Sequence, residues 1–371
     1  MKIIHLVLGK GNPERMNGVN KVAYQLATSQ TNLGHDVTLW GIANSLEENY
    51  PSRNFKTQLF TQIKNKFVID AKLKSAIQSL SNDTIVHLHG SFIPEFYHAT
   101  QLLNQQNISY IYTPHGSLTE MAMTKNKFVK KVYFELFESR LIAKAKRVQL
   151  LGVNEFSYLD KLTKRANKCL IANGQDMGVI PMYPSKSIKG DSPVFGFCGR
   201  IAKFHKGLDL MLRGFQQYIH GGGEGVLELI GDGGDRKEIE QLAVELKIAD
   251  KVVFHGKKFG KEKFDLLNRM DVFLHTSRME GFPTAVLEAA ALKIPTITSE
   301  ATNINSYVKQ YNCGFTLTDN SPAEIAETMH TAFQFFKENK LEKMGEEGRR
   351  MVEQEFDWEK IATQLIQVYA A

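Results

Sequence analysis

Short apolar runs alternate with longer segments of mixed polarity along most of the chain. Apolar runs of about four to eight residues are typical of buried strands, and apolar residues at helical spacing fill the segments between them. Such alternation predicts parallel sheets that are covered by helices on both faces. We expect strands in two series, the first at 3–8, 36–42, 84–88, 108–112 and 147–151, the second at 194–199, 226–230, 251–255, 271–275 and 295–298.

A different kind of sequence separates the two series. Residues 180–193 read IPMYPSKSIKGDSP, and this Pro-, Ser- and Lys-rich composition is typical of an interdomain connection. We therefore predict an α/β protein with two Rossmann-like, doubly wound domains, residues 1–180 and residues 181–355. Ligands of such folds bind beyond the carboxyl ends of the strands, so a cleft between the two domains is the expected site.

Composition and charge narrow the function classes. The chain has 371 residues, 43% of them hydrophobic, and a net charge of +6. This mild positive charge favours an anionic ligand or a membrane surface weakly and does not indicate nucleic acid. The three cysteines, Cys169, Cys198 and Cys313, form no close metal-type pair and fit a reducing compartment.

The lengths of the apolar runs also indicate where in the cell the protein is expected. The opening MKIIHLVLGKG is interpreted as a first strand and not as a signal peptide, because it has no small-residue cleavage site. No run approaches the roughly 20 apolar residues that span a bilayer. We expect a cytoplasmic protein, and peripheral contact with the cytoplasmic face of the plasma membrane stays open.

Three common nucleotide motifs are incomplete or missing. GKGNPE, residues 9–14, supplies two glycines of a dinucleotide fingerprint, but Glu14 stands where a small residue is needed, which disfavours an oxidoreductase. The chain has no G-x-x-x-x-G-K-[ST] phosphate loop. DGGD, residues 232–235, lacks the flanking carboxylates of a metal site.

Two cations follow the first strand of the second series. In FGFCGRIAKFHKGLDLMLRGF, Arg200 and Lys206 come after the strand and Gly207 opens an amphipathic helix. Arg with its planar donor fork and Lys as a point charge would match the charge of a diphosphate. The alternative is a pair of ordinary surface cations.

A second strand end carries two carboxylates in EGFPTAVLE. Glu280 lies in the loop, Pro283 suits the first helical position, and neither Gly281 nor Phe282 offers a capping side chain, so the first N–H groups stay open to an anion. Glu288 falls about one and a half turns into the helix. A ligand with hydroxyls on both sides of a phosphate could meet both carboxylates, although solvated glutamates on an ordinary helix remain the alternative.

Taken in order, these segments resemble the retaining nucleotide-sugar glycosyltransferases of glycosyltransferase family 4, whose GT-B fold has two Rossmann-like domains. The resemblance covers nearly the whole chain. FDWEKIATQLIQVY, within residues 356–371, resembles the terminal helix that crosses back to the first domain. Asn17-Gly18 departs from the family's Gly-Gly turn. The other matching segments are NGVNKVAYQLA, HLHG, TPHGS, GRIAKFHKG, LIGDGGDR, VVFHGKKFGKEKFDLLNRMDVFLHTS and EGFPTAVLEAAALKIPTI.

The resemblance implies a role for each matching position. Glu280 would accept hydrogen bonds from the donor sugar, Glu288 would accept from the ribose, and Arg200 with Lys206 would neutralise the diphosphate, so that no metal or other cofactor is required. His115 would face the reacting sugar. The remaining donor-binding positions would act largely through their backbone: Gly18, Gly256, Gly281, Phe282 and Thr284.

The implied reaction moves a hexose or N-acetylhexosamine from a nucleotide-sugar to a glycan or lipid-linked glycan in surface polysaccharide biosynthesis. A UDP-sugar is the first candidate for the donor and a GDP-sugar is the second. The family mechanism retains anomeric configuration, and the strand-end segments HLHG and TPHGS offer no carboxylate nucleophile. Two alternatives share the fold: a sugar-nucleotide epimerase, and a catalytically silent nucleotide-sugar-binding protein.

Two features stay open. His87 and His89 share one face of a strand, and either could be structural. A predicted helix from Lys125 to Lys146 combines many lysines with an apolar stripe, which either packs on its own sheet or rests on anionic lipid near a lipid-linked acceptor. The stripe comprises Phe128, Val129, Val132, Tyr133 and Leu136.

Overall fold

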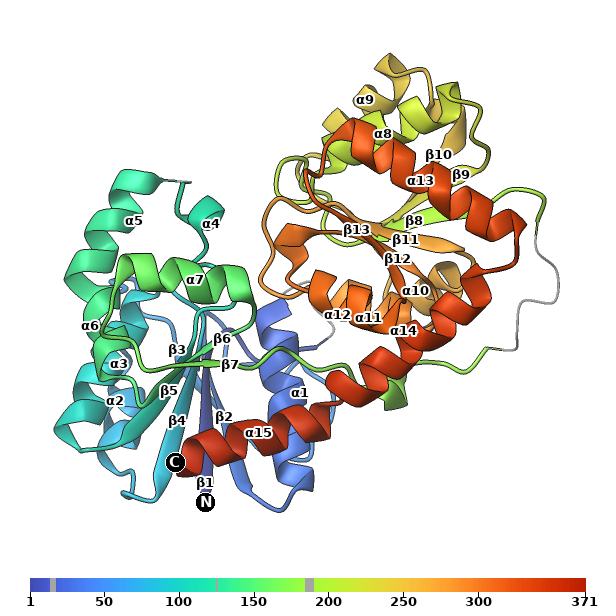
Figure 1. Cartoon of the computed structure of the whole chain (residues 1–371). Coiled ribbons are helices and arrows are strands. Elements are labelled where there is room, and N and C mark those ends of the chain that lie inside the picture. Colours follow the sequence, from blue (N-terminus) through green and yellow to red (C-terminus); the bar gives the residue numbers. More distant parts are fainter. Residues whose placement is uncertain (14–17, 125, 184–189) are drawn as a thin grey trace. The chain divides into compact units, whose positions relative to one another are not determined.

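The computed structural model describes residues 1–13, 18–124, 126–183 and 190–371. The chain divides into two compact units (Figure 1): unit 1 is Met1–Gly174 with Trp358–Ala371, and unit 2 is Gln175–Asp357. Glu14, Asn17, Lys125 and residues 184–189, on which parts of the sequence predictions fall, lie outside the described residues.

Unit 1 is built on a parallel sheet with strand order β3-β2-β1-β4-β5-β6-β7, so the order reverses between β1 and β4. Both edge strands were missed by the sequence prediction, because one alternates polar residues and the other has only three residues. The strands are β1 (Lys2–Leu8), β2 (Asp36–Ala43), β3 (Lys56–Thr61), β4 (Thr84–His89), β5 (Ser109–Thr113), β6 (Arg147–Leu150) and β7 (Lys168–Leu170).

The helices of unit 1 include a segment from the far end of the chain. Helix α15 packs against α1, and its buried residues Trp358, Ile361 and Leu365 join the same apolar cluster as Val22 and Leu26 of α1. The helices are α1 (Gly18–Asn32), α2 (Ala71–Gln78), α3 (Pro94–Gln105), α4 (Glu120–Thr124), α5 (Lys127–Tyr133), the π-helical η1 (Phe134–Glu138), α6 (Ser139–Lys144), α7 (Val153–Leu162) and α15 (Trp358–Ala370).

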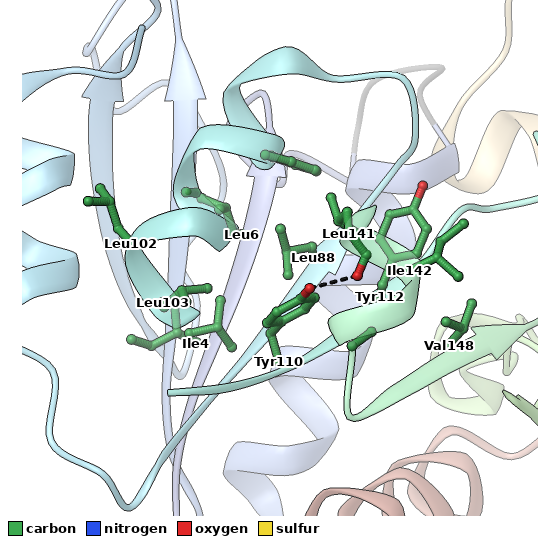
Figure 2. Close-up of a cluster of buried hydrophobic side chains, with 14 of the residues drawn as sticks. Ile4, Leu6, Leu88, Leu102, Leu103, Tyr110, Tyr112, Leu141, Ile142 and Val148 are labelled. Carbon is green, nitrogen blue, oxygen red and sulfur yellow. Dashed lines mark hydrogen bonds between the residues drawn. The ribbon is translucent and has the colours of Figure 1, made fainter. Parts of the chain in front are cut away.

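An apolar core fixes β4, β5 and their covering helices in unit 1. Figure 2 shows Tyr110 among Leu88, Leu103 and Leu141, all of them buried. The Tyr110 hydroxyl donates a hydrogen bond of 2.6 Å to the carbonyl of Leu141, so its one polar atom is satisfied inside the core.

Unit 2 repeats the architecture with strand order β10-β9-β8-β11-β12-β13, all parallel, and the order reverses between β8 and β11. The sequence prediction found every strand but β13. The strands are β8 (Val194–Cys198), β9 (Val226–Ile230), β10 (Val252–Gly256), β11 (Val272–His275), β12 (Thr296–Ser299) and β13 (Gly314–Leu317).

Helices follow each strand of unit 2. The α-helices are α8 (Leu208–His220), α9 (Arg236–Glu245), α10 (Gly260–Leu267), α11 (Thr284–Ala291), α12 (Asn305–Tyr311), α13 (Pro322–Lys337) and α14 (Leu341–Glu355), and the short 3₁₀ turns are η2 (Met177–Val179), η3 (Ala249–Lys251) and η4 (Glu300–Thr302). Within the described ranges, none of the helices in either unit has the length and apolar character needed to cross a membrane.

Candidate functional site

The two motifs singled out in the sequence meet where the strand order of unit 2 reverses. Strands β8 and β11 are neighbours there, and in open α/β sheets ligands bind in the crevice outside the carboxyl ends of such a strand pair. Lys206 lies in the loop after β8 and Glu280 in the loop after β11, and their side chains form an ion pair between Lys206 Nζ and Glu280 Oε2. Each side chain is 16% exposed, so the pair is partly buried and reaches the surface of the unit.

Glu280 has two further partners. Ser277 Oγ donates to Glu280 Oε2 over 3.3 Å, and Nε2 of His275 lies 3.2 Å from the same oxygen. Burial would raise the pKa of Glu280, but the Lys206 ammonium and the His275 contact outweigh it and hold that pKa below its ordinary value. Glu280 is therefore a carboxylate at neutral pH.

His275, the last residue of β11, was not predicted as part of the site. It is 1% exposed and stacks on the rings of Phe197 and Phe273 at 5.7 and 6.1 Å. Burial and the nearby Lys206 charge lower its pKa, so the ring is neutral and donates Nε2–H to Glu280. A histidine at the end of a predicted buried strand is the sequence signal that could have found it.

Backbone contact joins the loops that carry Lys206 and Glu280. Gly207 has φ +61°, and a Cβ atom there would lie 2.0 Å from the carbonyl oxygen of Thr276. Arg278 adds a bidentate ion pair, donating to both carboxylate oxygens of Asp209 over 2.7 and 2.8 Å. The Lys-Gly pair in HKG thus has a physical reason, because only glycine permits this approach.

Pro283 lies just before the helix that follows Glu280 and not in its first turn. Helix α11 starts at Thr284, and Pro283 occupies the N-cap position, where it makes no side-chain cap hydrogen bond. The prediction that Pro283 is the first helical residue was therefore wrong, since its ψ of 102° is extended. Phe282 turns its ring into the core against Phe356 at 5.2 Å, which leaves only its backbone for a ligand. Asn303 Nδ2 donates to the carbonyl of Gly281 over 3.0 Å and fixes the loop.

Glu288 is not the solvated helix residue that was one alternative. It is 3% exposed, and its carboxylate pairs with Lys263 Nζ of α10 at 2.8 Å. Lys263 was missed because its partner lies on another helix. A buried carboxylate with an ion partner is an acceptor held in place, and its contact with a ribose remains a prediction.

Arg200 and Gly256 lie at the same end of the sheet, Arg200 after β8 and Gly256 at the end of β10, with β9 between these two strands. Gly256 ends β10 with φ +70° and accepts a hydrogen bond of 2.8 Å from the N–H of Gly231. Arg200 follows β8 and is exposed. Among the described residues no hydrogen bond or ion pair ties Arg200 to the Lys206–Glu280 pair, so its phosphate contact also remains a prediction.

In unit 1, Gly18 is the first residue of α1, and a Cβ atom there would meet nothing within 4 Å. Packing within the described residues therefore does not demand glycine at this position. Close approach of a ligand to the backbone is the other reason for a glycine, as the sequence prediction holds.

His115 follows β5 and adopts the left-handed conformation with φ +55°. Its Nε2 lies 3.1 Å from Nδ1 of His89. Burial lowers the pKa of His115 to about 3, so its imidazole is neutral at physiological pH. His115 can therefore offer one ring nitrogen as a hydrogen-bond acceptor.

His87 and His89, the weaker candidates, are fully buried with His5 of β1. His5 Nδ1 lies 2.9 Å from His89 Nε2, and one nitrogen from each of the three rings lies within 4.8 Å of the others. His5, Gln30 and Tyr369, which contact this group, were not predicted. A histidine inside the apolar strand KIIHLVL is the signal for the first of them.

Comparison with known proteins identifies the family. The model for "Glycosyltransferase Family 4" matches residues 16–150, and the model for "Glycosyl transferases group 1" matches residues 182–351. The chain therefore belongs to the GT-B glycosyltransferases of family 4, and it is an enzyme of the transferase class.

Individual relatives agree on the class. The N-acetyl-alpha-D-glucosaminyl L-malate synthase of Bacillus anthracis is 32% identical over 144 residues, which is 38% of this chain and only 36% of the relative. The O-antigen biosynthesis glycosyltransferase WclY of Escherichia coli is 24% identical over 100% of this chain and 98% of its own length. The solved structure of Anabaena Alr3699/HepE in complex with UDP matches with a TM-score of 0.80 at 17% identity and covers 100% of both chains, which confirms the predicted GT-B fold.

Proposed function

We propose that this enzyme moves a hexose or N-acetylhexosamine from a nucleotide-sugar to a glycan or lipid-linked glycan in surface polysaccharide biosynthesis. The first candidate for the donor is a UDP-sugar, and the second is a GDP-sugar. The observation that carries the proposal is the cluster of Lys206, Glu280 and His275 at the strand reversal of unit 2. The relatives support it, since WclY is an O-antigen biosynthesis glycosyltransferase and the HepE structure contains UDP.

The cluster suggests how the donor is held. Glu280 keeps two hydrogen-bond donors, His275 and Ser277, when Lys206 turns toward a phosphate. The carboxylate therefore stays charged and oriented, and it accepts from the sugar hydroxyls. The ammonium of Lys206 meets the negative charge that develops on the leaving diphosphate. We propose transfer with retention, in which the departing phosphate takes the acceptor's proton.

Metal-independent transfer is part of the proposal. Lys206 and Arg200 supply positive charge at this end of the sheet, and the described residues place no metal-type cluster of carboxylates, histidines and cysteines beside them. The one such group among the described residues is the histidine set of unit 1.

The test is product formation by the purified protein with UDP- and GDP-sugars, with and without a glycan acceptor and EDTA. Transfer should require the acceptor and persist in the chelator. A new sugar nucleotide formed without acceptor would favour the epimerase alternative. Activity that EDTA abolishes and manganese or magnesium restores would contradict the metal-free mechanism.

Replacing Glu288 and replacing Glu280 should affect different kinetic constants. Glu288→Gln is expected to raise the donor KM about tenfold with little change in kcat, because a ribose contact is the same in ground and transition states. Glu280→Gln is expected mainly to lower kcat, because the sugar moves as its bond breaks. Lys263→Gln is the matched control, since it breaks the Lys263–Glu288 ion pair and keeps the Glu288 acceptor. Equal losses in both Gln variants, all in KM, would contradict these roles.

We further propose that the lysine-rich helical segment of unit 1 contacts anionic lipid. Four residues of its apolar stripe are exposed, with Phe128 at 80% and Val129 at 67%, so the alternative that the stripe packs on its own sheet was wrong for them. Val132 and Leu136 are exposed as well, and Tyr133 is partly buried. Exposed apolar side chains among lysines are typical of interfacial helices.

Removing charge from this surface should weaken binding to vesicles. Lys130 donates to the carbonyl of Ala122 over 2.6 Å and supports the fold, so the test uses Lys127 and Lys131. The variant K127Q/K131Q is expected to bind phosphatidylserine vesicles about thirtyfold more weakly at low salt, from about 1 kcal/mol per lysine. K72Q/K74Q on α2 is the control. Equal sedimentation of both variants would contradict the membrane contact.

A further inference from the structure

A continuous chain of buried hydrogen bonds runs from a backbone carbonyl to His115 within unit 1. The side chains before His115 come from β1, α1, β4, β5, β6 and α15, and His115 lies in the loop after β5; Figure 1 shows these elements in one sheet and beside it. We call this chain the relay. In order, it consists of the Ile171 carbonyl, Gln149, Thr113, His87, Tyr369, Gln30, His5, His89 and His115.

The Ile171 carbonyl fixes the direction of the relay, because a carbonyl oxygen can only accept. Gln149 Nε2 donates to it over 2.9 Å, so Gln149 Oε1 faces Thr113 and accepts from its hydroxyl over 2.8 Å. The Thr113 oxygen then accepts from His87 Nε2–H over 2.6 Å. A neutral His87 is thus left with an acceptor at Nδ1, and the Tyr369 hydroxyl donates to it over 2.6 Å.

The same reasoning carries through to His115. The Tyr369 hydroxyl already donates its hydrogen to His87, so its oxygen accepts a hydrogen bond from Gln30 Nε2 over 3.2 Å. The other amide atom, Gln30 Oε1, therefore faces His5. His5 donates Nε2–H to that oxygen over 2.8 Å and accepts at Nδ1 from His89 over 2.9 Å. His89 therefore accepts at Nδ1 from His115 Nε2–H over 3.1 Å.

Each step requires neutral imidazoles, and burial supplies that condition. Burial lowers the pKa of His5 to about 4 and holds the pKa values of His87 and His89 well below the ordinary range. The side chains of the relay before His115 are all buried. Every donor in it has an acceptor, so no buried polar group of the relay is left unsatisfied.

The hydrogen bonds of the relay indicate that the three clustered histidines, His5, His87 and His89, are not a metal site. All six ring nitrogens of His5, His87 and His89 already hold a hydrogen-bond partner in the relay. A metal ion would need three of these nitrogens as lone pairs pointing at one centre, whereas His5 Nε2 and His87 Nε2 point to Gln30 and Thr113. The cluster is satisfied as a hydrogen-bonded set.

We propose that the relay sets the tautomer of His115 as Nε2–H, so that Nδ1 presents a lone pair to a hydroxyl of the substrate. Gln30 and Tyr369 are then positioning residues that act through His5 and His89. The role of His115 toward substrate rests on the proposed function. The tautomer itself does not, because it can be measured without turnover.

The experiment is NMR of the whole protein labelled with ¹⁵N-histidine, in which long-range ¹H–¹⁵N correlations identify each tautomer. His115→Asn assigns the signal of His115. In the unsubstituted protein His115 is expected as neutral Nε2–H. A neutral Nδ1–H ring, a doubly protonated ring, or metal-type shifts at His5, His87 and His89 would overturn the relay.

Gln30→Met tests the direction. Without the Gln30 acceptor, a buried His5 Nε2–H would be orphaned, which is costlier than an orphaned lone pair, so His5 shifts to Nδ1–H and the reversal spreads to His115. We expect His115 as Nδ1–H and kcat about tenfold lower with KM little changed. Gln25→Met, also buried on α1, is the matched control and should leave both unchanged. An Nε2–H signal in Gln30→Met would overturn the proposal.

Tyr369→Phe provides a second variant if Gln30→Met does not fold. It disconnects Gln30 from the Ile171 carbonyl, so both orientations of the amide become available and His115 should show both tautomers. A single unchanged Nε2–H signal would contradict the relay. An altered tautomer with unchanged turnover would support the relay and instead contradict the role of His115 in the proposed function.

Discussion

Replacement of Lys206 by Ala is expected to lower the rate of transfer about a hundredfold. A nucleoside diphosphate leaving group must have its charge matched, and Lys206 is the cation that the structure ties to Glu280 at the strand reversal. Removing one donor aimed at developing charge costs on the order of 3 kcal/mol of transition-state stabilisation. The measurement is kcat and kcat/KM for the donor at saturating acceptor.

The matched control is Lys203→Ala, three residues earlier in the same loop. Its ammonium pairs with Glu238 and is more exposed, so its loss should change neither the rate nor the stability by much. Full activity in Lys206→Ala would show that the diphosphate binds elsewhere, and a loss in both variants would indicate a general effect of charge on the loop.

The same variant should also be less stable. The ion pair is partly buried, and removing Lys206 leaves the Glu280 carboxylate without its main counter-charge. We expect the free energy of unfolding to fall by about 2 kcal/mol, less than for a fully buried pair. The double variant K206A/E280Q should recover the stability and stay inactive, which separates the two effects.

Gly207→Ala should produce the largest loss of stability among the site variants, about 3 kcal/mol or more in urea unfolding. The left-handed conformation alone costs an alanine about 1–2 kcal/mol. The added Cβ would also lie 2.0 Å from the Thr276 carbonyl oxygen, and neither backbone can give way without parting the two loops.

The control for backbone strain alone is Gly222→Ala. Gly222 has φ +85° and nothing within 4 Å of its added Cβ, so only the conformational cost remains. Similar losses in the two variants would show that the contact between Gly207 and Thr276 relaxes cheaply. A larger loss in Gly207→Ala would show that this contact holds the loop of Lys206.

The sequence predicted central strands well and edges poorly. Apolar runs mark strands that are buried on both faces, and β1, β4 and β8 all have this pattern. The missed strands β3, β7 and β13 lie at the ends of their sheets, where one side meets no strand and polar residues are tolerated. Their hydrogen-bonded register depends on the neighbouring strand, which local sequence does not reveal.

Site residues that stand close together in the sequence could be predicted from it. Glu280 and Glu288 stand in one short motif, and their burial and partners could not be read from it. Lys206 is 74 residues from Glu280, and Gln30 is 339 residues from Tyr369. Such pairs are set by the fold and not by local sequence, so Lys263, Gln30 and Tyr369 became visible only once the structure was known.

The position of α15 at the end of unit 1's sequence affects the order in which the two units can fold during translation. Unit 2 is one uninterrupted stretch, Gln175–Asp357, whereas unit 1 takes in Trp358–Ala371 after unit 2 has been made. Trp358 and Leu365 complete an apolar cluster with α1, and Tyr369 closes a hydrogen bond to Gln30. During translation, unit 1 therefore begins to emerge before unit 2 and is completed after it. Until α15 arrives, the nascent chain carries an uncovered apolar face on α1 that chaperones can recognise.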